Sequence, residues 1–202
     1  MRYDAEHKEK TRQRVLKEAA RALREDGPEK IAVAGIMAAA GLTHGGFYAH
    51  FKSKDDLVAA AIDETFKDAG GRFARSTDGF TPEEGMVRYI NFYLSREHRD
   101  ARGTGCPVPT LSADLARLPE AARERYGLGV ARLTGLVQGQ LERLGRDDAE
   151  ILAPSVVAEL VGAVALARAV SDPEQSNEIL RVSRQAVRQR LGLDHIQLKA
   201  VQ

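Results

Sequence analysis

The sequence has little cysteine, no tryptophan and few aromatic residues. Its 202 residues include a single cysteine, and phenylalanine and tyrosine together make up only 5% of the chain. One cysteine cannot form an internal disulfide, which fits a reducing compartment. Strands favour aromatic and β-branched residues, whereas alanine, leucine and arginine dominate here, so the composition favours helices. We therefore expect an all-α protein.

The chain also lacks a strong net charge. Thirty Lys and Arg residues oppose 29 Asp and Glu residues, which gives a formal charge of +1. The charge is uneven, however, because residues 1–54 hold 11 Lys and Arg against 7 Asp and Glu, and the remainder holds 19 against 22. A basic N-terminal segment on a slightly acidic body is typical of a nucleic-acid-binding head on a separate core.

A long apolar run is missing near the N-terminus. Residues 1–17 are charged, so we expect neither a secretory signal nor a membrane span there. Residues 151–170 are apolar and long enough to span a bilayer, but Glu159 and Arg168 interrupt them and Pro154 lies near their start. We expect a buried helix at 151–170, no membrane contact and a cytoplasmic protein.

Apolar residues recur with helical spacing along the chain. In the first such segment, Val15, Ala19 and Leu23 lie on an apolar face, and the arginines and lysine at 12, 14, 17, 21 and 24 lie largely outside it. The pattern predicts about nine helices, over residues 10–26, 33–40, 44–51, about 54–75, 83–97, a short helix between 107 and 117, 119–144, about 147–170 and 173–191.

Three local signals mark helix ends near residue 50. Gly41 is expected to end the second helix in a left-handed conformation, and the Thr43 hydroxyl is expected to cap the third. Ser53 and Asp56 have the spacing of a capping box at the start of the fourth. The run from Gly70 to Pro82 is rich in turn-forming residues and is predicted to be a loop between head and core.

The most informative segment is residues 36–57, IMAAAGLTHGGFYAHFKSKDDL. It resembles the DNA-binding domain of the tetracycline-repressor family of bacterial transcriptional regulators. Many positions agree in order over about 20 residues, which is far more specific than a lone glycine motif. The matching residues are Ala40, Gly41, Thr43, Gly45, Phe47, Tyr48, His50, Phe51, Ser53, Lys54 and Leu57.

The resemblance implies a three-helix helix-turn-helix DNA-binding domain over residues 1–54. A helical effector-binding and dimerisation domain is implied over residues 55–202, beginning with a connecting helix over 54–75. A recognition helix must bring its N-terminal residues close to base edges, and the small Gly45 and Gly46 allow that approach. Phe47 and Phe51, four residues apart, are expected to anchor the helix in the head. The residues expected to bind DNA are Thr43, His44, Gly45, Gly46, Tyr48, His50, Lys52 and Lys54.

These residues are expected to differ in what they do on DNA. Thr43, Tyr48, Lys52 and Lys54 can donate to phosphates, which positions a helix without reading sequence. His44 is the candidate for direct contact with a base edge. His50 is interpreted first as a structural imidazole in the aromatic cluster, with a phosphate contact as the alternative.

One departure from the family pattern precedes the second helix. Members usually have Ser or Thr there, whereas this chain reads Ile31-Ala-Val-Ala-Gly35. A missing side-chain cap costs about 1 kcal/mol. Operator affinity is therefore expected to depend more on Lys52, Lys54 and arginines of the first helix.

The C-terminal helices are expected to serve two purposes by the same resemblance. The last two helices, over 147–170 and 173–191, are expected to pair two chains as a homodimer. The helices before them are expected to enclose a pocket for an unknown small-molecule effector, although residues at such spacing are more often plain core. The candidate pocket residues are Tyr89, Phe92, Tyr93, Cys106, Leu111, Leu115, Tyr126, Leu133, Val137 and Leu160.

Enzyme signals are weak. No cofactor or metal is expected, since the five histidines are scattered and no phosphate-binding loop follows a strand. His98, Ser112 and Asp114 form an imaginable triad without a nucleophile elbow. We expect no enzyme but a ligand-responsive repressor that binds a palindromic double-stranded DNA operator as a homodimer. The alternative is a helical small-molecule-binding protein or a thiol-based redox or electrophile sensor with weak or no DNA specificity. In such a sensor, Cys106 would lie beside a helix N-terminus that lowers its pKa, whereas a buried, inert cysteine is the favoured interpretation.

Overall fold

The computed structural model describes residues 2–198. Within this range it contains nine α-helices and three short 3-10 helices and has no strand, which confirms the predicted all-α class. The elements are α1 (Arg2–Asp26), α2 (Val33–Ala39), η1 (His44–Ala49), α3 (Lys54–Thr77), α4 (Pro82–Tyr93), α5 (Arg96–Asp100), η2 (Arg102–Thr104), α6 (Val108–Leu111), η3 (Leu115–Arg117), α7 (Glu120–Arg143), α8 (Ala149–Ala169) and α9 (Pro173–Arg190).

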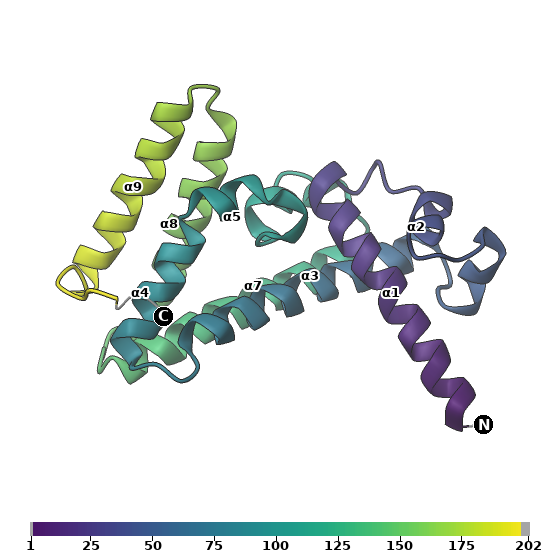
Figure 1. Cartoon of the computed structure of the whole chain (residues 1–202), viewed down its shortest axis with the longest axis horizontal. Helices are drawn as coiled ribbons and strands as arrows, with labels where there is room; N and C mark the ends of the chain where they lie inside the picture. Colours follow the sequence, from purple (N-terminus) through teal and green to yellow (C-terminus); the bar gives the residue numbers. More distant parts are fainter. Residues whose placement is uncertain (1, 199–202) are drawn as a thin grey trace.

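The long axis of the molecule is formed by α3 and α7, which pack side by side (Figure 1). At one end α1 crosses α3, and α2 and η1 lie beyond it; we call this end the head and the remainder the core. At the other end α8 and α9 form an antiparallel hairpin. Between the two ends, α5 and α6 contact α8 while η2 contacts α1. The short segments from α5 to α6 therefore connect the core to the head.

The head is held together by large apolar side chains. Leu23, Met37, Phe47 and Phe51 are each no more than 2% exposed, and the rings of Phe47 and Phe51 stack with centroids 5.7 Å apart. Burying one such side chain contributes roughly 1.5–3 kcal/mol. Gly41 follows α2 with φ of +70°, a conformation that residues with a Cβ rarely adopt. The predicted anchors and the predicted glycine cap are confirmed.

The third helix differs from the prediction. Residues 44–49 form the 3-10 helix η1 rather than an α-helix over 44–51. Gly45 and Gly46 follow each other at its start, and glycine is a poor helix former. The Thr43 hydroxyl makes no capping hydrogen bond, so the predicted cap is wrong. A short segment without a cap takes the tighter winding that isolated turns often show.

The predicted loop over 70–82 is mostly wrong. The helix α3 continues through Gly70 and Gly71 to Thr77, and only residues 78–81 leave the helix. Two internal glycines cost about 2 kcal/mol of helix stability. Phe66 and Phe73 on either side are buried, and their burial outweighs this cost.

Two other predicted helices are each divided in the structure. The helix expected over 83–97 is α4 and α5, because the chain leaves the helix at Leu94 and Ser95. The Ser95 hydroxyl then caps α5 by accepting from the backbone N–H of His98 at 3.0 Å. The short helix expected between 107 and 117 is α6 followed by η3.

Arg24 of α1 lies in the interior, although it was expected outside the apolar face. Its side chain is buried, Nε donates to the carbonyl oxygen of Gly103 at 2.6 Å, and Nη2 donates to Asp68 at 3.0 Å. Arg24 follows the fully buried Ala20 by four residues, which is the sequence signal for its burial. These bonds join the head to α3 and to η2.

The helix α8 is not wholly buried, contrary to expectation. It is the one helix among the described residues that is long and apolar enough to cross a membrane, and only 39% of that window is buried within the chain. Ile151 is 80% exposed and Leu166 is 61% exposed, and Val182 on α9 is 47% exposed. The hairpin of α8 and α9 thus presents apolar side chains outward.

Candidate nucleic-acid interface

The residues predicted to bind DNA gather on the outer side of the head. Thr43, His44, Lys52 and Lys54 are exposed, and Tyr48 is 73% exposed while its neighbour Phe47 is buried. A large aromatic side chain in solvent loses the stabilisation of burial, so this position requires an explanation. The surface formed by residues 43–54, which we call the η1 face, combines this tyrosine with two lysines.

The two glycines of the η1 face are not needed for packing within the chain. A Cβ added at Gly45 would meet no atom within 4 Å, and one added at Gly46 would meet only the Met37 side chain at 3.7 Å, an ordinary contact. Neither glycine has a positive φ. The fold therefore permits alanine at position 45 without strain. The missing side chain leaves space on the outside, where a partner can approach the backbone closely.

The η1 face is held rigidly from behind. The Arg12 guanidinium of α1 lies over the Phe51 ring, 5.0 Å from its centroid. Arg14 donates through Nη2 to the carbonyl oxygen of Ala40, at the end of α2. Such contacts between charged and aromatic or carbonyl groups contribute about 0.5–2 kcal/mol each. Two arginines expected to be free for DNA thus help to position α2 and η1.

His50 is partly buried beside the Phe51 ring, with the two ring centroids 6.4 Å apart. Burial lowers the pKa of its imidazole, and the nearby positive charges of Lys8 and Arg12 lower it further. Its Nδ1 atom is buried and has no hydrogen-bond partner. The imidazole is therefore neutral near pH 7, and its packing fits the structural interpretation better than a phosphate contact.

The helices behind the η1 face begin in different ways. The residue before α2 is Ala32, which has no side-chain cap, as the sequence predicted. The Ser53 hydroxyl accepts from the backbone N–H of Asp56 at 3.1 Å, as predicted. The Asp56 carboxylate in turn accepts a hydrogen bond from the backbone N–H of Lys52 at 2.9 Å. This exchange fixes the turn that carries Lys52 and Lys54.

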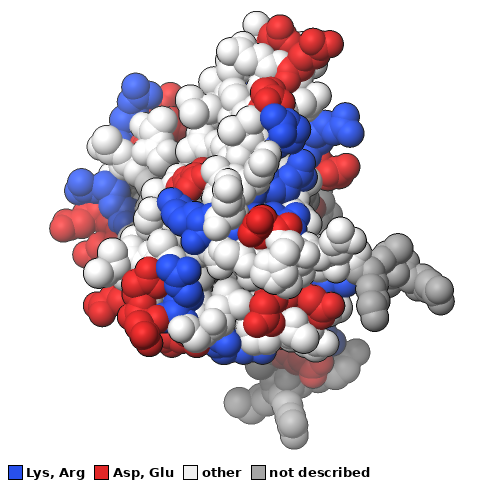
Figure 2. Space-filling model, turned by 90° about the vertical axis from the view of Figure 1, so that its left-hand side faces the viewer, with Lys and Arg blue, Asp and Glu red and all other residues white. Residues whose placement is uncertain are grey.

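The end of the molecule away from the head has a different surface. There, Lys and Arg side chains alternate with Asp and Glu side chains over the visible face (Figure 2). The excess of positive charge in residues 1–54 is thus not matched by a comparable patch on that face. A net excess of positive charge favours contact with the phosphate backbone of DNA.

The second predicted site, the pocket, is only partly assembled. Four predicted residues, Tyr89, Phe92, Tyr93 and Cys106, line a small cavity together with Ala69, Arg72 and His98. Its volume is about 10 Å³, at the lower limit for one water molecule. Leu111, Val137 and Leu160 are buried core residues, Leu115 is half-buried in η3, and Tyr126 packs edge-on against Phe66.

Leu133 instead lines a separate groove between α3 and α7. This groove has a volume of about 430 Å³ and is formed by Phe66, Leu133 and Leu136 with three glycines, and Lys67 and Arg132 lie at its edge. The predicted set of pocket residues therefore belongs to two separate spaces and to the core.

Cys106 does not have the environment that a reactive thiol requires. It is buried, and burial raises the pKa of its thiol, which contradicts the expected lowering by a helix N-terminus. Reactive cysteines are partly exposed and have a lowered pKa. The burial of Cys106 agrees with its favoured interpretation as an inert thiol and not with the alternative of an accessible, acidic one.

His98 is a central residue that the sequence analysis considered only as part of a triad. Its Nδ1 lies 2.6 Å from the carbonyl oxygen of Tyr93, and its Nε2 lies 2.9 Å from the backbone nitrogen of Cys106. A carbonyl only accepts and a backbone N–H only donates, so the imidazole is neutral with its proton on Nδ1. Burial lowers its pKa to about 4. Neither ring nitrogen is left for Ser112.

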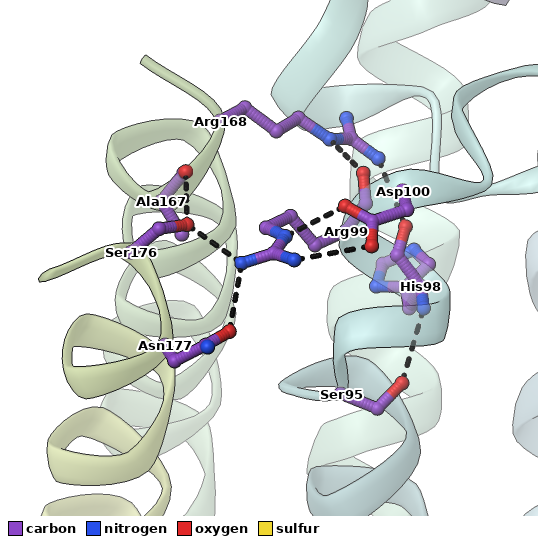
Figure 3. A network of polar contacts seen from close by, with 8 residues as sticks. All are labelled: Ser95, His98, Arg99, Asp100, Ala167, Arg168, Ser176 and Asn177. Atoms are coloured by element: carbon purple, nitrogen blue, oxygen red, sulfur yellow. Dashed lines mark hydrogen bonds and ion pairs between the residues drawn. The ribbon is translucent and has the colours of Figure 1, made fainter. Parts of the chain in front are cut away.

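A polar network connects α5 to α8 and α9 (Figure 3). Arg168 of α8 donates to the carbonyl oxygens of Arg99 at 2.8 Å and His98 at 3.1 Å. The Arg99 side chain donates to Ser176 at 2.7 Å and to Asn177 at 3.0 Å, both on α9. The segment that borders the cavity is thus bonded to the α8–α9 hairpin.

The comparisons with known proteins agree with this arrangement. Residues 15–61 match the family model described as bacterial regulatory proteins, tetR family. A TetR transcriptional regulator from Chloroflexus aurantiacus J-10-FL is 26% identical, with a TM-score of 0.75 over 91% of this chain and 97% of that chain. No curated protein sequence matches the chain.

Two further solved structures share the fold. NemR from E. coli in its reduced form is 20% identical, with a TM-score of 0.76 over 89% of this chain and 97% of that chain. A TetR-family transcriptional regulator from Agrobacterium tumefaciens is 22% identical, with a TM-score of 0.73 over 89% of this chain and 98% of that chain. The matched head and the fold of the whole chain thus lead to one conclusion: residues 15–61 resemble the DNA-binding domain of TetR-family regulators, and the chain as a whole has the fold of that family's solved structures.

Proposed function

We propose that the protein is a homodimeric repressor that binds a palindromic operator and is released by a small-molecule effector. Residues 1–54 act as the DNA-binding domain and residues 55–202 as the effector-binding and dimerisation domain. The observation that carries the proposal is the η1 face, where an exposed tyrosine and two lysines surround glycines that the fold itself does not require. Thr43, His44, Gly45, Gly46, Tyr48, Lys52 and Lys54 contact the duplex, and His50 supports the aromatic cluster beneath them.

The exposed apolar side chains of the α8–α9 hairpin support the homodimer. Ile151, Leu166 and Val182 leave large apolar surfaces in water, and a second copy of the hairpin would cover them. Two copies of two antiparallel helices form a four-helix interface of a common kind. A two-fold dimer presents two η1 faces, which matches a palindromic operator.

The bonds around α5 support release by an effector. The cavity wall includes His98 of α5, and the same segment is bonded to α8 and α9 through Arg99 and Arg168. The loop that follows accepts a hydrogen bond from Arg24 of the head at Gly103. A ligand that displaces this segment therefore changes the position of the head relative to the dimer. A coupling of about 1–3 kcal/mol changes operator affinity roughly 5- to 150-fold.

The protein then acts in the cytoplasm as a regulator without catalysis or a membrane partner. The arrangement of His98, whose two nitrogens are both bonded to backbone, supports this part of the proposal. The alternative of a thiol-based sensor gains no support from Cys106, which is buried and has a raised pKa.

Selection from a random duplex pool with the purified, reduced protein tests the proposal. We expect an enriched inverted repeat that is bound about 10³-fold more tightly than scrambled DNA at the same salt concentration. Tyr48→Ala serves as the matched control, because it removes a contact without disturbing a buried side chain. Binding that vanishes with salt and shows no sequence preference, in protein stripped of ligand by refolding, would contradict the proposal.

A further inference from the structure

The cavity beside α5 contains hydrogen-bond donors without matching acceptors. Arg72 reaches it from α3, and its Nη1 atom is buried without a partner. The Tyr93 hydroxyl is also buried, with no hydrogen-bond partner stronger than the Cys106 thiol beside it, and the Tyr93 side chain is only 2% exposed. A buried donor that lacks a partner destabilises the fold, and it does so more when it is charged. Such groups mark a place where a partner is missing.

The charges around this cavity are unbalanced. Asp68 is the acidic neighbour of Arg72, but its carboxylate already accepts from Arg24 at 3.0 Å. Two buried or half-buried arginines thus share one carboxylate. Burial lowers the pKa of the Arg72 guanidinium, and the positive charges of Arg24 and Arg75 lower it further. An additional negative charge at this place would be stabilised.

The other polar groups that line the cavity do not supply that charge. The Cys106 thiol is neutral, since burial raises its pKa. The acceptor nitrogen of His98 is already bonded to the backbone N–H of Cys106. The lining therefore supplies no carboxylate for Arg72, and its remaining side-chain acceptors, the tyrosine hydroxyls and the Cys106 thiol, are neutral.

The rest of the lining is aromatic. The rings of Tyr89 and Tyr93 have centroids 5.7 Å apart at an angle of 63°, and Tyr93 meets His98 at 4.6 Å. Phe92 lies 5.2 Å from His98 and, apart from Arg72, is the only lining residue that is not fully buried. Because the cavity holds about 10 Å³, a ligand must open it, and Phe92 lies at the edge that is closest to solvent.

We propose that the effector of this protein is a small planar aromatic carboxylate, whose carboxylate binds Arg72 and the Tyr93 hydroxyl and whose ring packs against Tyr89 and Phe92. A guanidinium and a carboxylate form the strong, paired hydrogen bonds that the lining now lacks. The inference rests on the proposed function, since it names the chemical class of the effector. It also links effector and head, because the charges of Arg72 and Arg24 lie near the same carboxylate, Asp68, and Arg24 donates to the carbonyl oxygen of Gly103 in η2.

Calorimetric titration of the full-length protein without DNA tests the class of ligand directly. The probes are benzoate and 1-naphthoate, with benzamide and 1-naphthamide as neutral counterparts of the same shape and sodium sulfate as an inorganic anion. We expect at least one carboxylate to bind with a Kd of about 10 mM or lower. Its amide should bind with a Kd at least about tenfold higher. Equal binding of acid and amide, binding of sulfate only, or no binding of either carboxylate would overturn the proposal.

Two variants on α3 make the test specific. Arg72→Met removes the charge but keeps an apolar stem, so carboxylate binding falls to the level of the amide. Arg75→Met removes an exposed arginine three residues further along the same helix and binds as the unmodified protein does. Equal losses in both variants would contradict a site at Arg72.

Stability distinguishes a ligand site from a structural role. Since Arg72 Nη1 has no partner in the chain, Arg72→Met and Tyr93→Phe should leave the melting temperature of the ligand-free protein unchanged or raise it. A marked fall would mean that a bound water already satisfies these donors, and the proposal would be wrong. Operator binding is measured separately, in the absence of ligand. A protein that binds no operator would contradict the proposed function but would leave the carboxylate site untouched.

Discussion

In the head, the side chains assigned to DNA stand in solvent, whereas in the core the polar groups around the cavity are closed off from it. Tyr48 of the η1 face is 73% exposed, and Gly45 leaves open space outside the chain. In the core, Arg72 keeps a buried donor without a partner, and the Tyr93 hydroxyl has none stronger than the Cys106 thiol, around a space of about 10 Å³. Both regions therefore contain groups whose placement costs free energy within the isolated chain.

The difference between the two regions reflects the size of the partner that each would take. A duplex is too large to enter a protein, so the residues that meet it must project from a rigid surface. A small ligand can be surrounded, and its site can close when it is absent. The exposed side chains of the η1 face are accessible to a partner, whereas the buried groups around the cavity are enclosed by α3, α4 and α5.

Truncation of a head anchor should separate the two regions most strongly. Phe47→Ala removes a ring that is 2% exposed and should cost about 3–5 kcal/mol of head stability. Operator binding should be lost while the dimer of α8 and α9 persists, which gel-shift assays and light scattering will measure together. If the variant is monomeric, head and core fold as one unit, which would contradict their separation into two independent regions.

Acid should destabilise the core through His98. Its pKa is about 4 in the fold against an ordinary value of 6.5, so between these values the unfolded chain takes up a proton that the folded chain does not. The free energy of unfolding therefore falls as the pH drops from 6.5, by about 1.4 kcal/mol at pH 5.5 and about 3 kcal/mol at pH 4. Above pH 6.5 this contribution is fully present.

Denaturant titrations of the protein and of His98→Gln at pH 7.5 and 5.5 check this dependence. The variant retains the other four histidines and should lose most of the difference between the two pH values. If the free energy of unfolding changes equally with pH in both proteins, a group other than His98 is responsible.

Loss of the exposed tyrosine should weaken DNA binding without affecting stability. Tyr48→Ala removes a hydroxyl that can donate to a phosphate, and a hydrogen bond to a charged group contributes roughly 1.5–3 kcal/mol. The loss should be equal for operator and non-operator DNA, as measured by fluorescence anisotropy. Tyr48→Phe lacks only the hydroxyl and should show most of the same loss of affinity. A loss confined to operator DNA would mean instead that Tyr48 contacts bases.

His44→Ala should have a smaller and different effect. A single base-edge hydrogen bond is worth about 1 kcal/mol, so overall affinity changes little. The preferred base should instead change at one position in each half-site, which a repeated selection from random duplexes will reveal. An unchanged preferred sequence would remove His44 from direct readout.

The sequence was most informative where apolar spacing is long or where a motif is dense. Burial of Val15, Ala19 and Leu23 follows from their spacing, and the helices α7 and α9 agree with prediction within two residues at either end. The η1 face could be located because its motif combines buried phenylalanines with exposed polar residues. What each residue does on DNA stays a prediction.

Errors arose where tertiary packing overrides local preference. Gly70 and Gly71 favour a loop on their own, but α3 continues because Phe66 and Phe73 are buried. Arg72 resembles any arginine of an amphipathic helix, and its place beside the cavity depends on α4 and α5, which no local pattern specifies. Phe92, Tyr93 and Cys106 were found as lining residues only because aromatic and sulfur-containing side chains are commonly internal.

The measurement that tests the account most directly is a parallel determination of operator affinity and stability for Gly45→Ala. A Cβ at position 45 meets nothing within 4 Å in the free protein, so stability should stay the same or rise by roughly 0.5–1 kcal/mol. The added methyl group would occupy the space reserved for the duplex, so operator affinity should fall about tenfold or more. Unchanged operator affinity in this variant would contradict the claim that the η1 face meets DNA.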